Sequence, residues 1–184
     1  MEPMDLHTHS NMSDGTCTPS LLVEKAKAAG VTTLAIADHD KISGSQEAAP
    51  LCARAGIRLI PAAEVDTVLR GVLVHVLAYF PDFANAAFLA MLQDSRAKLD
   101  GMSDILIDRL AARGKNVSRE EYAFFPEMRE KGGWKALYYL AHKGIVAAPK
   151  QALRLYGDYG VRYADQGFIA TENAIRVIHE SGGQ

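Results

Sequence analysis

Two histidines lie one residue apart near the start of the chain, in the segment MDLHTHSNMSDG at residues 4–15. Side chains alternate between the two faces of a strand, so His7 and His9 share a face and their imidazoles can converge on one point. Asp14 follows in a loop. Its neighbour Gly15 can adopt a left-handed backbone conformation and so permits a tight turn, which would bring the Asp14 carboxylate back toward the histidines. The segment therefore predicts the first part of a metal site.

Three more side chains of the same chemistry stand at or near the ends of apolar segments. His39 follows LAIAD, Glu64 lies near the end of residues 57–65, and His75 interrupts VLVHVL. Each alone also fits a structural role: a hydrogen-bonded core histidine, or a carboxylate on a rim. Parallel α/β sheets, however, collect functional side chains at the carboxyl ends of their strands.

Taken together, these residues predict one site with more donors than a single ion needs. Two or three divalent ions sharing bridging ligands would use all six side chains. Histidine with carboxylate, and without thiolate, favours manganese, zinc or iron.

The elements that must position these residues alternate between strand and helix patterns. Strands are expected at residues 3–9, 31–38, 57–65 and 71–80, and helices at residues 19–29, 43–56 and 83–113. Thr18 is the expected N-cap of the first helix and Gly30 its end, whereas Pro50 is expected to interrupt the second helix. The alternation predicts an α/β protein with a parallel sheet. Only a few polar residues precede the fourth strand, which indicates an antiparallel pair or a tight turn there.

Beyond Gly114 the strand–helix alternation stops, and residues 115–155 resemble a small helical insertion. Ser118 and Glu121 have the spacing of a capping box. The segment WKALYYLAHKG predicts a short amphipathic helix that ends at Gly144. A final helix is expected over residues 171–183, beginning at Thr171.

Composition excludes several classes of protein. The 184 residues fit one domain, with 48% hydrophobic and 23% charged residues and a formal net charge of −2, which argues against disorder and against a strongly basic nucleic-acid-binding protein. The first residues lack a secretory signal and no segment is apolar enough to span a bilayer, so we expect a cytoplasmic protein. Cys17 and Cys52 lack zinc-finger spacing, and we interpret both as reduced thiols.

Four segments in order, DLHTHSNMSDGTCTP, LAIADHD, AEV and VHVLAYF, resemble the PHP (polymerase and histidinol phosphatase) family of metal-dependent phosphoesterases. The resemblance covers residues 4–80 well and the whole chain loosely. It implies a distorted, TIM-like (β/α)7 barrel with a trinuclear metal site. The implied metal ligands are His7, His9, Asp14, His39, Glu64 and His75, and Asp14, His39 and Glu64 are also the expected catalytic residues.

The same resemblance implies an organisation and a substrate site. Residues 1–114 would form the N-terminal part of the barrel, residues 115–165 a helical lid, and residues 166–184 a return helix. Lys131 and Lys135 are the expected substrate-binding residues, although both also fit ordinary solvated lysines. Members of the family commonly carry Arg-Pro-His before this helix; here Lys131 takes the place of the arginine and Gly133 that of the histidine.

The expected activity is hydrolysis of a small phosphate ester, such as a nucleotide or a nucleoside bisphosphate, through metal-activated hydroxide. Asp5, Asp38 and Asp40 are expected to orient ligand imidazoles. A polynucleotide substrate is disfavoured because the sequence has no basic stripe.

Other interpretations stay open. In the family, the strands that complete the site, one with His-Pro and a later one with Asp-x-His, follow the segment that corresponds to IHESGGQ, so we expect either a longer parent protein or a second chain to complete the barrel. The alternative functions are a non-catalytic metal-binding or interaction module and an amidohydrolase-like metal hydrolase.

Overall fold

The computed structural model describes residues 2–184 and contains a four-stranded sheet in the order β1-β2-β3-β4. The strands are β1 (Met4–Thr8), β2 (Thr33–Ile36), β3 (Arg58–Leu69) and β4 (Val72–Tyr79). The first three strands are parallel, and β4 pairs antiparallel with β3, as predicted. Arg70 and Gly71 both have positive φ, the conformation of a tight hairpin turn.

The third strand extends beyond its predicted end at Val65. Pairing with β4 runs from Ala62 opposite Tyr79 to Leu69 opposite Val72, so the hairpin keeps this segment extended. The prediction followed only the apolar run, and it ended where polar residues enter the strand.

In the described part of the chain, seven α-helices accompany the sheet: α1 (Pro19–Ala28), α2 (Ser43–Ala55), α3 (Ala86–Ala112), α4 (Arg119–Phe124), α5 (Lys135–His142), α6 (Leu153–Asp158) and α7 (Thr171–Glu180). Thr18 caps α1 as predicted, accepting a hydrogen bond from the Leu21 amide at 3.2 Å. The predicted interruption at Pro50 is wrong, because α2 continues through it. A proline removes one helical hydrogen bond, and the buried side chains of Ala48 and Cys52 hold both sides of this position in one hydrophobic cluster.

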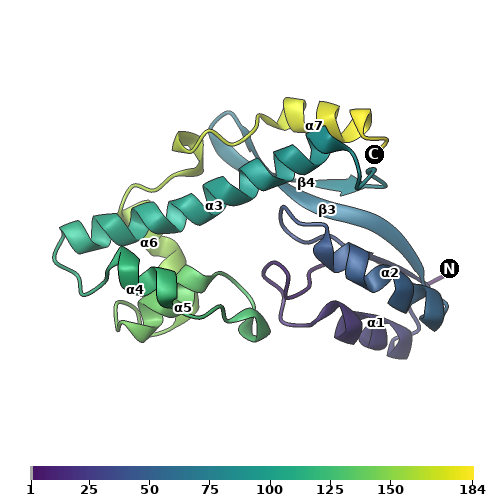
Figure 1. The fold of residues 1–184 in the computed structure, drawn as a ribbon, viewed down its shortest axis with the longest axis horizontal. Helices are drawn as coiled ribbons and strands as arrows, with labels where there is room; N and C mark the ends of the chain where they lie inside the picture. Colours follow the sequence, from purple (N-terminus) through teal and green to yellow (C-terminus); the bar gives the residue numbers. More distant parts are fainter. Residues whose placement is uncertain (1) are drawn as a thin grey trace.

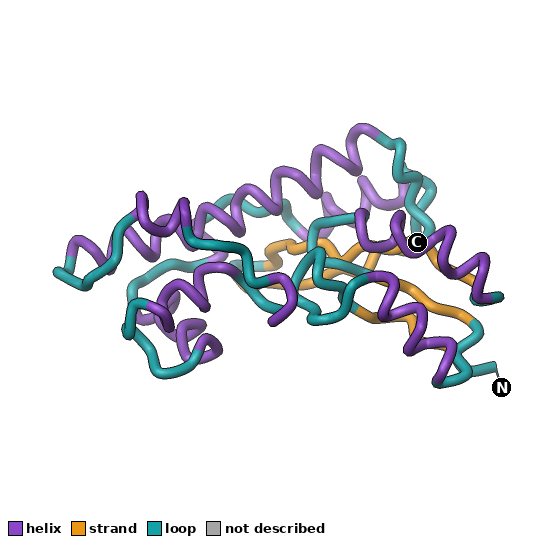
Figure 2. Tube along the Cα trace, turned by 60° about the horizontal axis from the view of Figure 1, so that its bottom comes forward, coloured by secondary structure: helices purple, strands orange, loops and turns teal. Residues whose placement is uncertain are grey.

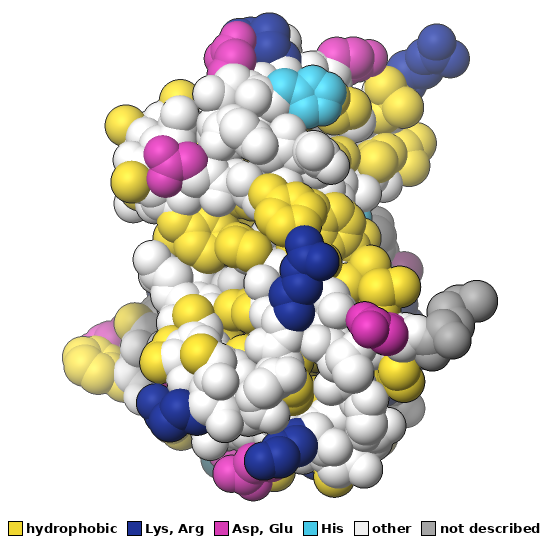
Figure 3. Space-filling view, turned by 90° about the vertical axis from the view of Figure 1, so that its right-hand side faces the viewer, with side chains coloured by type: hydrophobic (Ala, Val, Ile, Leu, Met, Phe, Trp, Pro, Cys, Tyr) yellow, Lys and Arg dark blue, Asp and Glu magenta, His cyan; other side chains and the backbone are white. Residues whose placement is uncertain are grey.

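Helices cover both faces of the sheet, and both chain ends lie in the half of the molecule that contains the strands (Figures 1 and 2). The α1 and α2 helices pack on one face, where Leu34 and Ile36 are buried against Val23 and Ala48. The α3 and α7 helices share a separate cluster with residues of β3 and β4. An end-on view shows a band of hydrophobic side chains across the molecule (Figure 3). Within residues 2–184 no helix is long and apolar enough to cross a membrane.

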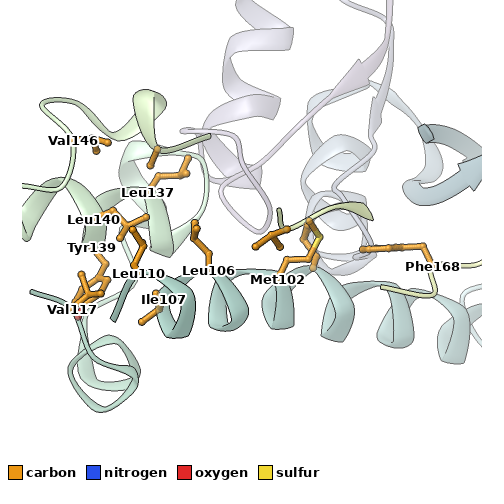
Figure 4. Close-up of a cluster of buried hydrophobic side chains, with 13 residues drawn as sticks. Met102, Leu106, Ile107, Leu110, Val117, Leu137, Tyr139, Leu140, Val146 and Phe168 are labelled. Atoms are coloured by element: carbon orange, nitrogen blue, oxygen red, sulfur yellow. The ribbon is translucent and has the colours of Figure 1, made fainter. Parts of the chain in front are cut away.

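A second core lies beyond the sheet, on the C-terminal half of the 27-residue helix α3 (Figure 4). There Leu106 and Leu110 pack against Leu137 and Leu140 of α5. Residues 115–155, called the helical module below, therefore pack against α3 in one shared hydrophobic cluster. The module's first helix, α4, is capped by Ser118, whose hydroxyl accepts a hydrogen bond from the Glu121 amide at 3.1 Å.

Candidate metal centre

The two N-terminal histidines converge as their spacing predicts. The Nε2 atoms of His7 in β1 and His9 just after it lie 3.0 Å apart. Both also reach one carboxylate oxygen, Glu64 Oε2, at 3.1 and 2.9 Å. Asp14 turns back toward them, with Oδ1 2.7 Å from His9 Nδ1. The loop therefore adds a second carboxylate to the imidazole pair.

A buried network fixes the loop that carries Asp14. The Asp38 carboxylate accepts hydrogen bonds from the Ser10 amide at 2.8 Å and from the Ser10 and Ser13 hydroxyls at 2.6 Å. Asp38 was expected to orient an imidazole, and its role in the structure is instead to hold this loop. Gly15 does not adopt the left-handed conformation considered for it. It is required for close approach, since a Cβ there would lie 2.2 Å from the His9 carbonyl oxygen.

Backbone pairing beyond β2 brings the other ligand candidates to the same point. The Glu64 amide donates to the Asp38 carbonyl at 3.1 Å, which places His39 beside β3. His39 Nε2 then lies 3.6 Å from Glu64 Oε2, and His75 Nδ1 lies 2.8 Å from Glu64 Oε1. The Glu64 side chain is only 5% exposed, against 47% for His7. Glu64 therefore forms the base of the cluster, and the imidazoles surround it.

Asp66 is a member of the site that the sequence analysis missed. Its Oδ1 accepts a hydrogen bond from His39 Nδ1 at 3.0 Å, and its side chain is 3% exposed. A carboxylate in this position fixes the ring so that the other nitrogen faces the cluster. The signal was present, because Glu64 and Asp66 are two residues apart in one strand, but the strand was predicted to end at Val65.

The other two carboxylates expected to orient imidazoles lie elsewhere. Asp40 Oδ1 accepts a hydrogen bond from the Asp66 backbone amide at 3.1 Å, so Asp40 holds the backbone of β3 at Asp66. Asp5 is exposed on β1, beside a shallow hollow of about 190 Å³ that Lys25 and Leu34 also line.

The electrostatics of the cluster favour positive charge at its centre. Burial lowers the pKa of His9, but the hydrogen bonds to Asp14 and Glu64, together with the negative charges of these two carboxylates, outweigh burial and raise that pKa to about 10. Burial likewise raises the pKa of Glu64, and hydrogen bonds from His75 and His9 outweigh it and lower that pKa well below its usual range. The hydrogen bond to Glu64 raises the pKa of His75. A divalent cation would take the place of these protons.

The donor set fits divalent metal. Three groups of ligand atoms, each within 4.8 Å of one another, contain all six residues predicted as ligands: His7, His9 and Glu64; His9, Asp14 and His39; and His39, Glu64 and His75. His9, His39 and Glu64 each belong to two groups, which is the pattern expected for ions that share ligands. Nitrogen and carboxylate oxygen donors suit first-row transition metals.

A cavity of about 770 Å³ lies beside the cluster, between the loop at residues 11–13 and the helical module. Trp134 lines it, with its ring centroid 5.8 Å from that of His39 in an edge-on contact. The Gly133 amide donates to the Asp14 carbonyl at 2.8 Å, which joins the helical module to the metal-site loop. Of the two predicted substrate-binding lysines, Lys135 lines this cavity. Lys131 is not one of the lining residues, and its Nζ lies 6.0 Å from the ring centroid of Tyr138, which does line the cavity.

Comparison with known proteins gives consistent matches. The PHP domain model matches residues 5–176. The chain is 32% identical over 189 residues to a 5′-3′ exoribonuclease of Haemophilus influenzae, covering 97% of this chain and 65% of that protein. It is 30% identical to a phosphoribosyl 1,2-cyclic phosphate 1,2-diphosphodiesterase of Eggerthella lenta, covering 97% of this chain and 70% of that protein.

Among solved structures, that of an amidohydrolase from Chromobacterium violaceum with bound sulfate and no metal has a TM-score of 0.78 and 28% identity. The match covers 98% of this chain and 64% of that one. The chain thus spans about two thirds of the length of these relatives.

Proposed function

The chain belongs to the PHP domain family, and we propose that it is a metal-dependent phosphoesterase acting on a small phosphate ester. The observation that carries the proposal is the cluster around Glu64, where four imidazoles and two carboxylates converge beside a cavity. A cavity of this volume is within the range that binds small molecules.

We assign the cluster two or three divalent ions, manganese, zinc or iron, held by the six predicted ligands. Such ions, when bound, supply Lewis acidity, which acidifies water and offsets the negative charge of a phosphoryl group. Within the chain, Asp14, His39 and Glu64 are the proposed catalytic residues, and Asp66 positions His39. Lys135 is the residue of the cavity wall that we propose to meet a phosphate oxygen, and residues 115–165 form the lid.

A second candidate function is 5′-3′ exoribonuclease activity, which the name of the Haemophilus influenzae relative favours. Charge in the cavity supports a small ester over a polynucleotide. Its charged lining residues are four basic ones (Lys41, Arg96, Arg119 and Lys135) and four acidic ones (Asp100, Asp104, Glu120 and Glu127). A polynucleotide path normally carries an excess of positive charge.

The test is hydrolysis by the purified chain loaded in turn with Mn²⁺, Zn²⁺ or Fe²⁺. The substrates are p-nitrophenyl phosphate, a panel of mononucleotides, a 5′-phosphorylated oligoribonucleotide and an amino-acid p-nitroanilide. Glu64→Gln should abolish the activity, and Glu24→Gln, an exposed change on α1, should leave it intact.

Each substrate class decides between functions. Hydrolysis of small phosphate esters that depends on Glu64 supports the proposal. Hydrolysis of the oligoribonucleotide alone supports the second candidate, and hydrolysis of the anilide alone supports an amidohydrolase. A metal-loaded chain that hydrolyses none of them refutes the proposal.

A further inference from the structure

Arg96 of α3 has a hydrogen-bond donor without an acceptor beside the cavity. Its Nε donates to Asp100 Oδ2 at 3.1 Å and its Nη2 donates to Asp100 Oδ1. Its Nη1 is buried and has no partner within residues 2–184. Leaving a buried donor unpaired is unfavourable, and the Arg96 side chain is one of those that line the cavity.

Arg96 also stands next to the metal cluster, separated from it by one side chain. The guanidinium carbon lies 4.9 Å from the Trp134 ring centroid, a cation–π contact. The same ring makes a T-shaped contact with His39, with 5.8 Å between the ring centroids. Arg96, Trp134 and His39 therefore form a continuous row from the cavity to the cluster.

We propose that Arg96, held in place by Trp134 and Asp100, recognises an anionic group on the part of the substrate that does not react. A guanidinium is suited to phosphate or carboxylate oxygens. Because Trp134 stands between Arg96 and His39, an anionic group bound to Arg96 would lie one side chain away from the metal cluster, where the reacting phosphate would bind. The inference rests on the proposed function for the ligand being a phosphate ester, and it makes Arg96 a specificity-determining residue.

The sequence offers a direct probe, because Trp134 is its only tryptophan. Ligand binding in the cavity should change tryptophan fluorescence, and the midpoint of a titration reports affinity without requiring hydrolysis. The probes are adenosine 3′,5′-bisphosphate and adenosine 5′-monophosphate, which differ by one phosphate. We expect the bisphosphate to bind more tightly to the unmodified chain.

Arg96→Gln should raise the apparent Kd of the bisphosphate about ten- to hundredfold, the range for one hydrogen bond to a charged group, with little change for the monophosphate. Arg96→Lys keeps the positive charge but loses the planar fork, so it should recover only part of the affinity. Arg113→Gln is the matched control, since Arg113 also lies over an aromatic ring, that of Tyr159, 4.5 Å away and outside the cavity lining. Thermal melts of all three variants establish that they fold.

The outcomes separate this inference from the proposed function. A selective loss of bisphosphate affinity in Arg96→Gln, absent in Arg113→Gln, supports recognition by Arg96 even if the chain hydrolyses no ester. Equal effects on both nucleotides, no effect on either, or unchanged tryptophan fluorescence with both would overturn it, even if the chain is an active phosphoesterase.

Discussion

Replacing Asp66 with asparagine tests whether the cluster is a metal centre built on oriented histidines. Asparagine keeps the shape of the side chain but removes the charge that accepts the His39 Nδ1 hydrogen bond at 3.0 Å. Two other bonds at this residue, the amide bond to Asp40 and the carbonyl bond from Ser95, involve only its backbone and remain. The perturbation therefore acts on the carboxylate, which contacts His39 and lies 3.8 Å from His75 Nε2.

Loss of such a partner carboxylate typically weakens metal affinity about 10- to 100-fold, or about 1.4 to 2.7 kcal/mol. His39 belongs to two of the three ligand groups, so Asp66→Asn should weaken the ions held there. The group of His7, His9 and Glu64 contains neither His39 nor Asp66 and should keep its affinity.

Calorimetric titration of the metal-free chain with Mn²⁺, together with metal content per chain, measures both effects. Asp5→Asn, an exposed change on the same sheet, is the control and should behave like the unmodified chain. If Asp66→Asn binds every ion as the unmodified chain does, or weakens all of them equally, the orientation argument is refuted.

Three further results are expected. Gly15→Ala would place a Cβ 2.2 Å from the His9 carbonyl oxygen, so the turn that carries Asp14 must shift. Metal content per chain and melting temperature should both fall. Unchanged values would count against the argument that this turn requires close approach. Metal affinity should rise as pH increases toward the His9 pKa of about 10, because a protonated imidazole must lose its proton to bind metal; proton release measured calorimetrically in two buffers checks the sign. Leu106→Ala, a fully buried position of α3 in the core that α3 shares with the helical module, should lower the free energy of unfolding in urea by about 2–5 kcal/mol, whereas the exposed Leu21→Ala should change it little.

The sequence by itself determined the donors of the candidate metal centre and most of the elements that carry them. Alternation along a strand placed His7 and His9 on one face, and the strand–helix order predicted a parallel sheet whose strand ends meet at one edge. Local chemistry also identified the cap at Thr18. These features depend on residues close together in the chain, and for that reason the sequence pattern predicts them.

Contacts between distant segments decided the rest. Pairing with β4 extended β3 and brought Asp66 under His39, and burial on both sides of Pro50 kept α2 continuous. Packing of the helical module placed Trp134 against His39, with Arg96 behind it. A periodic pattern indicates which face of a helix or strand is buried but not which segment covers that face. The contacts between these distant residues are therefore determined only by the tertiary structure.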